Sequence, residues 1–246
     1  MTIADRLSHL RQGIRAAAAQ VHRDPASITV IGVAKGVSPT DLKLAQAAGL
    51  DDMGENYLQE AEDHLAALST LPVTWHYIGA IQSNKTRAIA THFAWVHTLD
   101  RGKIAERLDA QRPASAPPLN VLIQVNFDNA ASKAGVSEDQ LPILGAQILT
   151  LPRLCWRGLM ALPEPRANPD EQQACFAKVR DSLAHLRRTF PNAPLDSLSM
   201  GMSNDYPAAI MAGATHIRIG TALFGARTFA RAPTGPSRSP QGAAQQ

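Results

Sequence analysis

Short apolar runs alternate with segments of helical periodicity along most of the chain. The runs expected to form strands span residues 28–34, 51–56, 74–80, 95–99, 119–127, 154–162, 196–202 and 215–225. The segments expected to form helices between them span residues 39–50, 57–68, 84–93, 101–111, 137–149, 170–190 and 205–214. A further helix is predicted over residues 2–21, because Ile3, Leu7, Leu10 and Ile14 recur at helical spacing before the first strand.

Regular alternation of strands and helices indicates an α/β fold with a parallel sheet and right-handed crossovers. Eight such units in 246 residues favour closure into a single (β/α)8 TIM barrel, to which the helix at 2–21 is an addition. An open, doubly wound sheet is the alternative, although AKGVSP and not a GxGxxG dinucleotide fingerprint follows the first strand. The weakest predicted strand is 51–56, because Asp and Gly are poor strand formers.

The composition is that of an ordinary globular protein, with 45% apolar and 18% charged residues. We expect no membrane partner and no signal peptide, because no apolar run is long enough to span a bilayer and charged residues occur near the N-terminus. Cys155 and Cys175 are too far apart for a CxxC pair and too few for a disulfide framework. These features predict a cytoplasmic protein.

The net charge of +3 is partly carried by the C-terminal segment 228–246, which contains Arg231 and Arg238 and no acidic residue. The remainder is nearly neutral, and only 5% of all residues are aromatic, so the sequence predicts no nucleic-acid partner. Segment 228–246 is rich in Pro, Gly, Ser, Ala and Gln and is expected to be a disordered tail. The barrel domain is therefore expected to span residues 1–227.

Barrels of this type have their sites at the C-terminal ends of the strands, and the first strand ends there with Lys35. Partial burial at this rim would favour a neutral amine, which can attack a carbonyl carbon to form a Schiff base. A lysine that simply ends a strand and extends to water is the simpler interpretation of this residue taken alone. The residues at the ends of the neighbouring strands are therefore needed to distinguish a Schiff-base lysine from a solvated one.

The seventh and eighth strands provide the features of an anion site. They lead into SMGMSND (199–205) and RIGTALFG (218–225), and the loops after these two strands often bind phosphate in TIM barrels. Gly201 and Gly220 permit close backbone approach, and Ser199, Ser203 and Thr221 offer hydroxyl groups. Because the eighth strand of a closed barrel adjoins the first, a phosphate site would lie beside Lys35. This combination fits pyridoxal 5′-phosphate or, less specifically, a phosphorylated sugar aldehyde. Turn formation and helix capping, with Ser203 or Asn204 as N-cap, are the alternative roles.

Several motifs together resemble the pyridoxal phosphate homeostasis proteins, which are single-domain relatives of the N-terminal barrel of alanine racemase. The motifs are VAKGVSP (33–39), MGENYLQE (53–60), WHYIGAIQSNK (75–85), SKAGV (132–136), RGLMAL (157–162), LSMGMSNDYPAAI (198–210) and THIRIGTALFG (215–225). They occur in the family's order and extend over roughly residues 3–227, which makes the resemblance far more specific than any single motif.

The resemblance implies a role for each of nine residues in binding pyridoxal 5′-phosphate (PLP). Lys35 would form the internal aldimine and Arg218 would face the pyridine nitrogen. Ser199, Ser203 and the backbone amides of Gly220 and Thr221 would hold the phosphate, Asn56 would lie near the ring, and Ile78 and Met160 would form walls. A cation beside the ring nitrogen disfavours its protonation, so the cofactor would be a weaker electron sink than one held by an acidic partner.

Two positions need comment within this resemblance. Relatives often carry a second lysine two residues after the aldimine lysine, where this chain has Val37. Lys133, in the SKAG motif, matches a family lysine on the loop after the fifth strand, and its role is left open. The tail also lacks lysine, so only Arg227 and Arg231 could supply basic residues just beyond the last strand.

The sequence thus predicts a monomeric PLP-binding protein that carries or buffers the cofactor, acts in vitamin B6 and amino-acid homeostasis, and has little or no turnover. Apo forms of PLP-dependent enzymes are the expected recipients. The first alternative is a PLP-dependent amino-acid racemase, which would need a second acid–base group from Tyr57, Tyr77 or Tyr206 because no second domain is expected after the barrel. A class I aldolase that uses Lys35 is the second. His76 and His97 alternate with apolar residues and are interpreted as core or rim histidines, and no metal site is expected.

Overall fold

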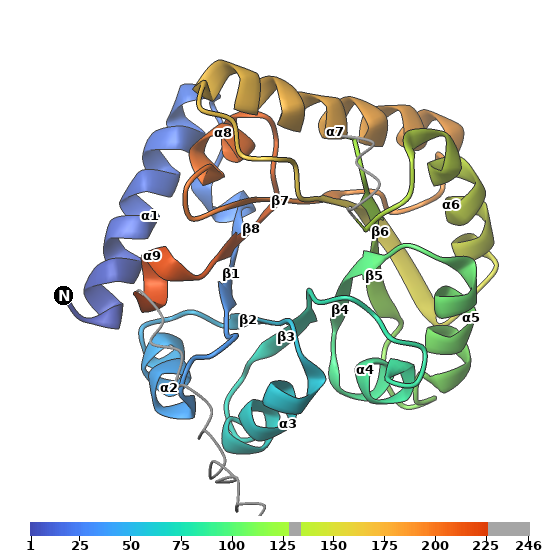
Figure 1. Cartoon of the computed structure of the whole chain (residues 1–246), viewed down its shortest axis with the longest axis horizontal. Helices are drawn as coiled ribbons and strands as arrows, with labels where there is room; N and C mark the ends of the chain where they lie inside the picture. The colour runs from blue at the N-terminus through green and yellow to red at the C-terminus, as the bar shows by residue number, and fades with distance from the viewer. Residues whose placement is uncertain (128–133, 226–246) are drawn as a thin grey trace, which may run out of the picture.

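The computed structural model describes residues 1–127 and 134–225, which form a closed eight-stranded parallel barrel surrounded by helices (Figure 1). The strands follow one another around the barrel in chain order, and β1 pairs with both β2 and β8. This confirms the predicted (β/α)8 barrel and excludes the open sheet. The predictions for Lys133 and for the tail at 228–246 lie outside the described residues.

The strands lie close to their predicted positions. They are β1 (Thr29–Val33), β2 (Asp52–Glu55), β3 (Thr74–Tyr77), β4 (Trp95–Leu99), β5 (Leu119–Val125), β6 (Leu154–Ala161), β7 (Ser197–Met202) and β8 (His216–Ile219). The weakest prediction, β2, is confirmed although its composition is unfavourable. Its side chains explain why: Met53 packs in the core, whereas Asp52 and Glu55 form hydrogen bonds with histidines. Polar residues that pair with other side chains can be accommodated in a buried strand.

The helices alternate with the strands around the outside of the barrel (Figure 1). They are α2 (Pro39–Ala47), α3 (Leu58–Ala67), α4 (Thr86–His92), α5 (Gly102–Gln111), α6 (Leu141–Leu149), α7 (Pro169–Thr189), α8 (Tyr206–Met211) and α9 (Thr221–Phe224), with short 3-10 turns at Pro25–Ser27 and Glu138–Gln140.

The additional N-terminal helix is α1 (Ile3–Gln20), as predicted. A capping box between Thr2 and Asp5 fixes its start, because each side chain bonds to the other residue's backbone N–H. Its apolar face, formed by Leu7, Leu10 and Ile14, is buried, and the helix packs against α8 and α9 (Figure 1). It therefore covers the seam of the barrel where the last unit meets the first.

The predicted eighth strand, 215–225, is too long. The strand ends at Ile219, and Thr221–Phe224 form the short helix α9. A short apolar run cannot distinguish a strand from a buried helical turn, and here the helical turn places Leu223 in the core. The N-terminus of helix α9 therefore lies immediately after β8, where the sequence predicts the phosphate site.

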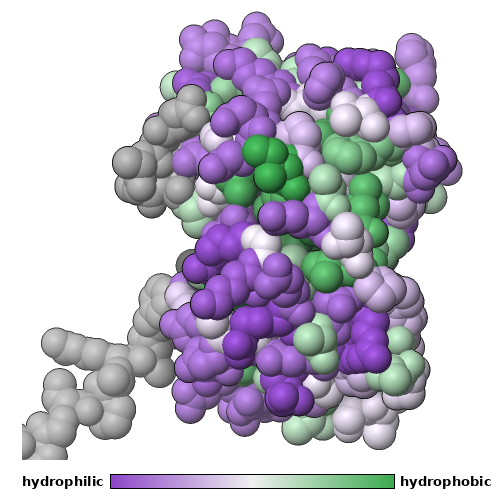
Figure 2. Space-filling model, turned by 90° about the vertical axis from the view of Figure 1, so that its right-hand side faces the viewer, coloured by the Kyte–Doolittle hydropathy of each residue, from purple (hydrophilic) through white to green (hydrophobic). Residues whose placement is uncertain are grey.

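Most of the surface visible in Figure 2 is hydrophilic, and its most strongly apolar residues gather near the middle of the view. Within the described residues, no helix has both the length and the apolar character needed to cross a membrane. Both cysteines, Cys155 and Cys175, are free and partly buried. The described chain is therefore held together by its packed core and hydrogen bonds and not by disulfides.

Arg112, which ends α5, is an unusual stabilising residue because its guanidinium is buried among backbone carbonyls. It donates hydrogen bonds to the carbonyl oxygens of Ala90 (2.7 Å), Phe93 (2.7 Å) and Pro117 (2.9 Å). Substitution Arg112→Met should lower the free energy of unfolding by about 2–4 kcal/mol, because buried acceptors would lose their donor. Urea denaturation of this variant beside Arg188→Met, an exposed arginine of α7, tests the prediction. Equal stability of the two variants would contradict it.

Candidate functional site

A cavity of about 460 Å³, here called the rim cavity, lies at the C-terminal ends of the strands. Predicted site residues from four separate segments meet in it: Lys35, Asn56, Ser203, Gly220 and Thr221. The remaining residues that line it are Val33, Pro165, Arg166, Gln172, Met202, Asn204 and Asp205. The structure therefore brings together an amine, several hydroxyl and amide groups and a helix N-terminus, as the sequence predicted.

Lys35 follows β1 and is half-buried at the rim. Its Nζ lies 3.3 Å from the hydroxyl oxygen of Tyr57 and 4.9 Å from the centre of the Tyr57 ring. The next residue, Gly36, has a φ of +66°, which favours glycine, and its N–H donates to Glu60 at 2.9 Å. Contacts from the α3 region thus hold the backbone and the amine of this loop.

A buried hydrogen-bonded pair also supports the Lys35 loop. Glu55 Oε1 lies 2.6 Å from His64 Nδ1, and His64 Nε2 lies 3.0 Å from the carbonyl oxygen of Val37. Burial raises the pKa of Glu55. Burial also opposes a charged His64, but the hydrogen bond and charge of Glu55 outweigh it and raise the pKa of His64. Val37 therefore contributes its backbone carbonyl at the position where relatives often carry a lysine.

The anion-binding features lie at the start of α9. The backbone amides in the first turn of a helix have no carbonyl partner within the helix, so they can donate to an anion. Ser203 reaches this turn, because its hydroxyl oxygen accepts from the N–H of Ala222 at 3.3 Å. The suggested N-caps of α8, Ser203 and Asn204, are corrected, since Asp205 occupies that position. Ser203 is thereby left to face the cavity.

Arg218 lies beneath the rim and is almost fully buried. It donates hydrogen bonds from Nη1 to Ser199 Oγ (2.7 Å) and from Nη2 to the carbonyl oxygen of Ala161 (3.0 Å). Burial lowers the pKa of Arg218 to about 10, so the guanidinium is charged at neutral pH. Asp205, which lines the rim cavity, partly offsets the effect of burial.

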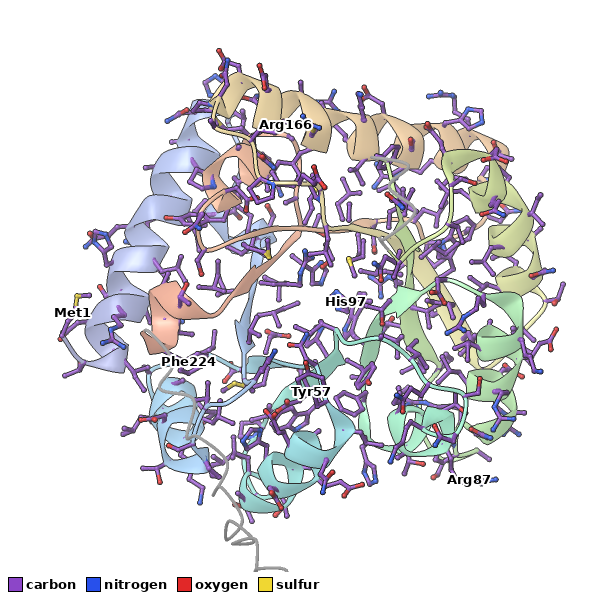
Figure 3. All side chains as sticks on the ribbon, in the orientation of Figure 1. Met1, Tyr57, Arg87, His97, Arg166 and Phe224 are labelled. Carbon is purple, nitrogen blue, oxygen red and sulfur yellow. The ribbon has the colours of Figure 1, made fainter. Side chains whose placement is uncertain are left out.

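Three other predicted site residues lie apart from the cavity lining. Ile78 and Met160 are buried in the barrel interior. Ser199 is also fully buried, and its hydroxyl is hydrogen-bonded to Arg218 and to His97 Nδ1 (2.8 Å). The contact of Ser199 with phosphate stays a prediction. His76 and His97 are interior residues, as predicted, and Figure 3 shows His97 within the ring of strands.

Sequence reasoning missed several residues of the site. Tyr57 was considered only as a racemase base, yet it contacts Lys35 directly. Pro165 and Arg166, in the proline-rich segment after β6, also line the cavity. Gln172 of α7 gave no sequence signal, because it occupies an ordinary position within a helical pattern. It is buried and lies 3.4 Å from Asp205.

Comparison with known proteins decides the family. Residues 6–228 match the family model described as alanine racemase, N-terminal domain. The pyridoxal phosphate homeostasis protein of Pseudomonas aeruginosa is 53% identical over 228 residues, which cover 93% of this chain and 97% of that protein. The chain belongs to the pyridoxal phosphate homeostasis protein family. The Escherichia coli member is 45% identical over 232 residues, covering 93% of this chain and 98% of its own.

Solved structures agree with membership of the pyridoxal phosphate homeostasis family. PipY of Synechococcus elongatus, with PLP bound, is 37% identical and has a TM-score of 0.81 over 91% of this chain and 100% of its own. Alanine racemase from Corynebacterium glutamicum shares only the fold, with 16% identity and a TM-score of 0.66. This chain covers 62% of that enzyme.

Proposed function

We propose that this protein binds PLP in the rim cavity and carries or buffers it, acting in vitamin B6 and amino-acid homeostasis with little or no turnover. The meeting of Lys35, Ser203, Gly220 and Thr221 in one cavity, above the buried Arg218, carries the proposal. The names of the relatives and the PLP bound to PipY support it. The side chains and amides present also match the chemical groups of PLP, which are an aldehyde, a phosphate and a pyridine ring.

When bound, PLP supplies an electrophilic aldehyde and an electron-withdrawing ring. Lys35 would hold the cofactor, because a lysine amine can form a C=N bond with an aldehyde carbon and release water. Tyr57 orients the amine through its hydroxyl group, and Glu60 holds the adjacent backbone N–H. In this proposal, therefore, Lys35 is the residue that links the protein to its cofactor.

The other predicted site residues would bind PLP and orient it. Ser203 and the amides of Gly220 and Thr221 would hold the phosphate at the start of α9, and Asn56 would lie beside the ring. Arg218 would face the ring nitrogen, and a guanidinium can only donate hydrogen bonds, so it would favour an unprotonated nitrogen. Ile78 and Met160 would provide apolar surface. Ser199 would support Arg218, to which it is hydrogen-bonded.

The positions of the tyrosines support binding over racemisation. The hydroxyl of Tyr77 donates to the carbonyl oxygen of Ala80 at 3.1 Å, and Tyr206 packs against Gly13 of α1. Tyr57 contacts the amine of Lys35 itself, whereas two-base racemisation needs a second group on the opposite face of the substrate. Arg218 further weakens the cofactor as an electron sink.

The proposal includes three expectations from the sequence. The protein is a monomer, it acts in the cytoplasm, and apo forms of PLP-dependent enzymes receive its cofactor. Transfer is best measured by mixing the loaded protein with an apo-aminotransferase and following the recovery of aminotransferase activity. A recovery rate that depends on the concentration of the loaded protein, and not only on free PLP, supports direct delivery.

Substitution Lys35→Ala should abolish the absorbance band at the violet edge of the visible spectrum that forms when purified protein is mixed with PLP, because no other residue in the cavity supplies the attacking amine. The control is Lys43→Ala, an exposed lysine of α2, which should keep the full band. The proposal fails if the unaltered protein gives no band or if Lys35→Ala retains it. Rapid exchange of the α-hydrogen of alanine in deuterated water would instead favour the racemase.

A further inference from the structure

A line of polar side chains crosses the interior of the barrel and ends at Arg218. Arg218 Nη1 lies 2.7 Å from Ser199 Oγ, which lies 2.8 Å from His97 Nδ1. His97 Nε2 lies 3.0 Å from His76 Nδ1, and His76 Nε2 lies 2.9 Å from Asp52 Oδ1. Each side chain comes from a different strand, namely β8, β7, β4, β3 and β2. We call this series the interior chain.

The donors and acceptors determine the direction of every hydrogen bond in the interior chain. Arginine can only donate, so Ser199 Oγ accepts from it and the Ser199 hydroxyl hydrogen is free to donate to His97 Nδ1. His97 then carries its proton on Nε2 and donates to His76 Nδ1. His76 likewise carries its proton on Nε2 and donates to the carboxylate of Asp52. All four bonds therefore point from Arg218 toward Asp52.

Burial keeps these histidines neutral, as this directional arrangement requires. Burial lowers the pKa of His97 well below its usual value, and the neighbouring His76, His216 and Arg218 lower it further. Burial also lowers the pKa of His76, although Asp52 acts in the opposite direction. A proton added to either ring would face another donor in place of an acceptor.

The two ends of the interior chain have different surroundings, although Arg218 and Asp52 both pair with Ile31 of β1 in the sheet. Arg218 lies below the rim cavity, whereas Asp52 begins β2 and lines a separate cavity with Thr29 and Val30, the first residues of β1. The carboxylate of Asp52 is 29% exposed, and the side chain of His76 is 1% exposed. The interior chain thus connects a partly hydrated carboxylate to a buried cation.

We propose that Ser199, His97, His76 and Asp52 are positioning residues for Arg218, through which the Asp52 carboxylate, in a separate cavity, tunes PLP binding in the rim cavity. Bonds that all point one way polarise each other, so the Asp52 charge strengthens the acceptor character of Ser199 Oγ toward the guanidinium. The inference rests on the proposed function, because it needs Arg218 to face bound cofactor.

The first test needs no cofactor and no substitution. Nitrogen-15 NMR of the imidazole rings in the ligand-free protein should show His76 and His97 as single Nε2–H tautomers between pH 6 and 8. Predominant Nδ1–H tautomers, or a mixture, would overturn the inference whatever the protein binds.

The second test compares Asp52→Leu with Asp52→Asn. Loss of the acceptor in Asp52→Leu should mix the histidine tautomers, shift the pH profile of the PLP absorbance band and speed PLP dissociation about 2- to 10-fold, the range expected for one weakened hydrogen bond. Asp52→Asn keeps an oxygen acceptor for His76 but removes the charge, so it should restore the tautomers while PLP dissociation stays faster than in the unaltered protein. The matched control is Asp51→Asn, an exposed neighbour, which should change neither measurement.

The outcomes of these tests distinguish coupling through the interior chain from the proposed function. A folded Asp52→Leu variant with the pH profile and dissociation rate of the unaltered protein would overturn the coupling, because a purely structural network would change only stability. Absence of a Lys35-dependent band in the unaltered protein would instead overturn the proposed function, while the NMR result would still test the arrangement of the interior chain.

Discussion

Lowering the pH from 6.5 to 5.5 is expected to reduce the free energy of unfolding by about 2–3 kcal/mol, because burial disfavours protonation of three histidines in the folded state. They are His76, His97 and His216, which face one another inside the barrel with ring centroids 5.2 to 6.2 Å apart. Burial lowers the pKa of each, in His216 to about 3. Urea denaturation at a series of pH values measures this loss.

The direction follows from proton uptake on unfolding. In the unfolded chain these histidines titrate near pH 6.5, so below that pH the unfolded state binds more protons and stability falls as pH falls. His64 acts in the opposite direction, because its pKa is raised by Glu55 against the effect of burial. Its contribution is fully present below pH 6.5 and is lost only as the pH rises through its folded-state value. The three interior histidines therefore dominate the change in the free energy of unfolding below pH 6.5.

Two variants define the source of the effect. His216→Phe should remove about one third of the pH dependence, because one of three proton-binding sites is lost from the unfolded chain. The phenylalanine ring would remain among aromatic neighbours, because the ring centroids of His216 and Trp95 lie 4.9 Å apart. His185→Gln, on the exposed surface of α7, should leave the slope between pH 6.5 and 5.5 within error of the unaltered protein. A flat stability profile over this range would contradict the account.

The barrel could be predicted from the sequence because the pattern of an apolar run followed by a helical segment repeats along the chain. Eight alternations of apolar runs and helical segments leave few topologies, and even β2 was found despite its Asp and Gly residues. The end of the last strand could not be predicted, because Thr221–Phe224 is as apolar as the strand before it. Only its packing shows that it turns into a helix.

The grouping of residues at the rim was predictable where the sequence places unusual residues at strand ends. Lys35, Ser203, Gly220 and Thr221 are such residues, and they meet in the rim cavity, whereas their roles stay predictions. The partners of these residues were not predictable, because they depend on which side chains face inward at the same height in the barrel. Ser199 illustrates this limit: its position on β7 suggested a phosphate ligand, and its contacts with His97 and Arg218 make it part of the interior.

Gly79, which follows β3, shows how backbone contact couples the fold to the rim cavity. A Cβ at this position would lie 1.9 Å from the carbonyl oxygen of Asn56 and 2.9 Å from its Cα. The backbone on the other side is also held, because Thr98 donates its hydroxyl hydrogen to the Gly79 carbonyl oxygen and the preceding Ile78 N–H donates to Glu55. Neither neighbour can yield without breaking hydrogen bonds between strands.

Substitution Gly79→Ala should therefore lower the free energy of unfolding by about 3 kcal/mol or more, because a methyl group would collide with backbone atoms that cannot move aside. It should also weaken PLP binding in the folded fraction, since the displaced residue, Asn56, lines the rim cavity. Gly102→Ala is the matched control. Its Cβ would meet only the end of the Gln147 side chain, at 2.3 Å. That side chain can rotate away, and alanine favours the helix that begins there, so the control should change stability by less than about 1 kcal/mol. Equal denaturant midpoints for the two variants would show that the contact with Asn56 is not rigid.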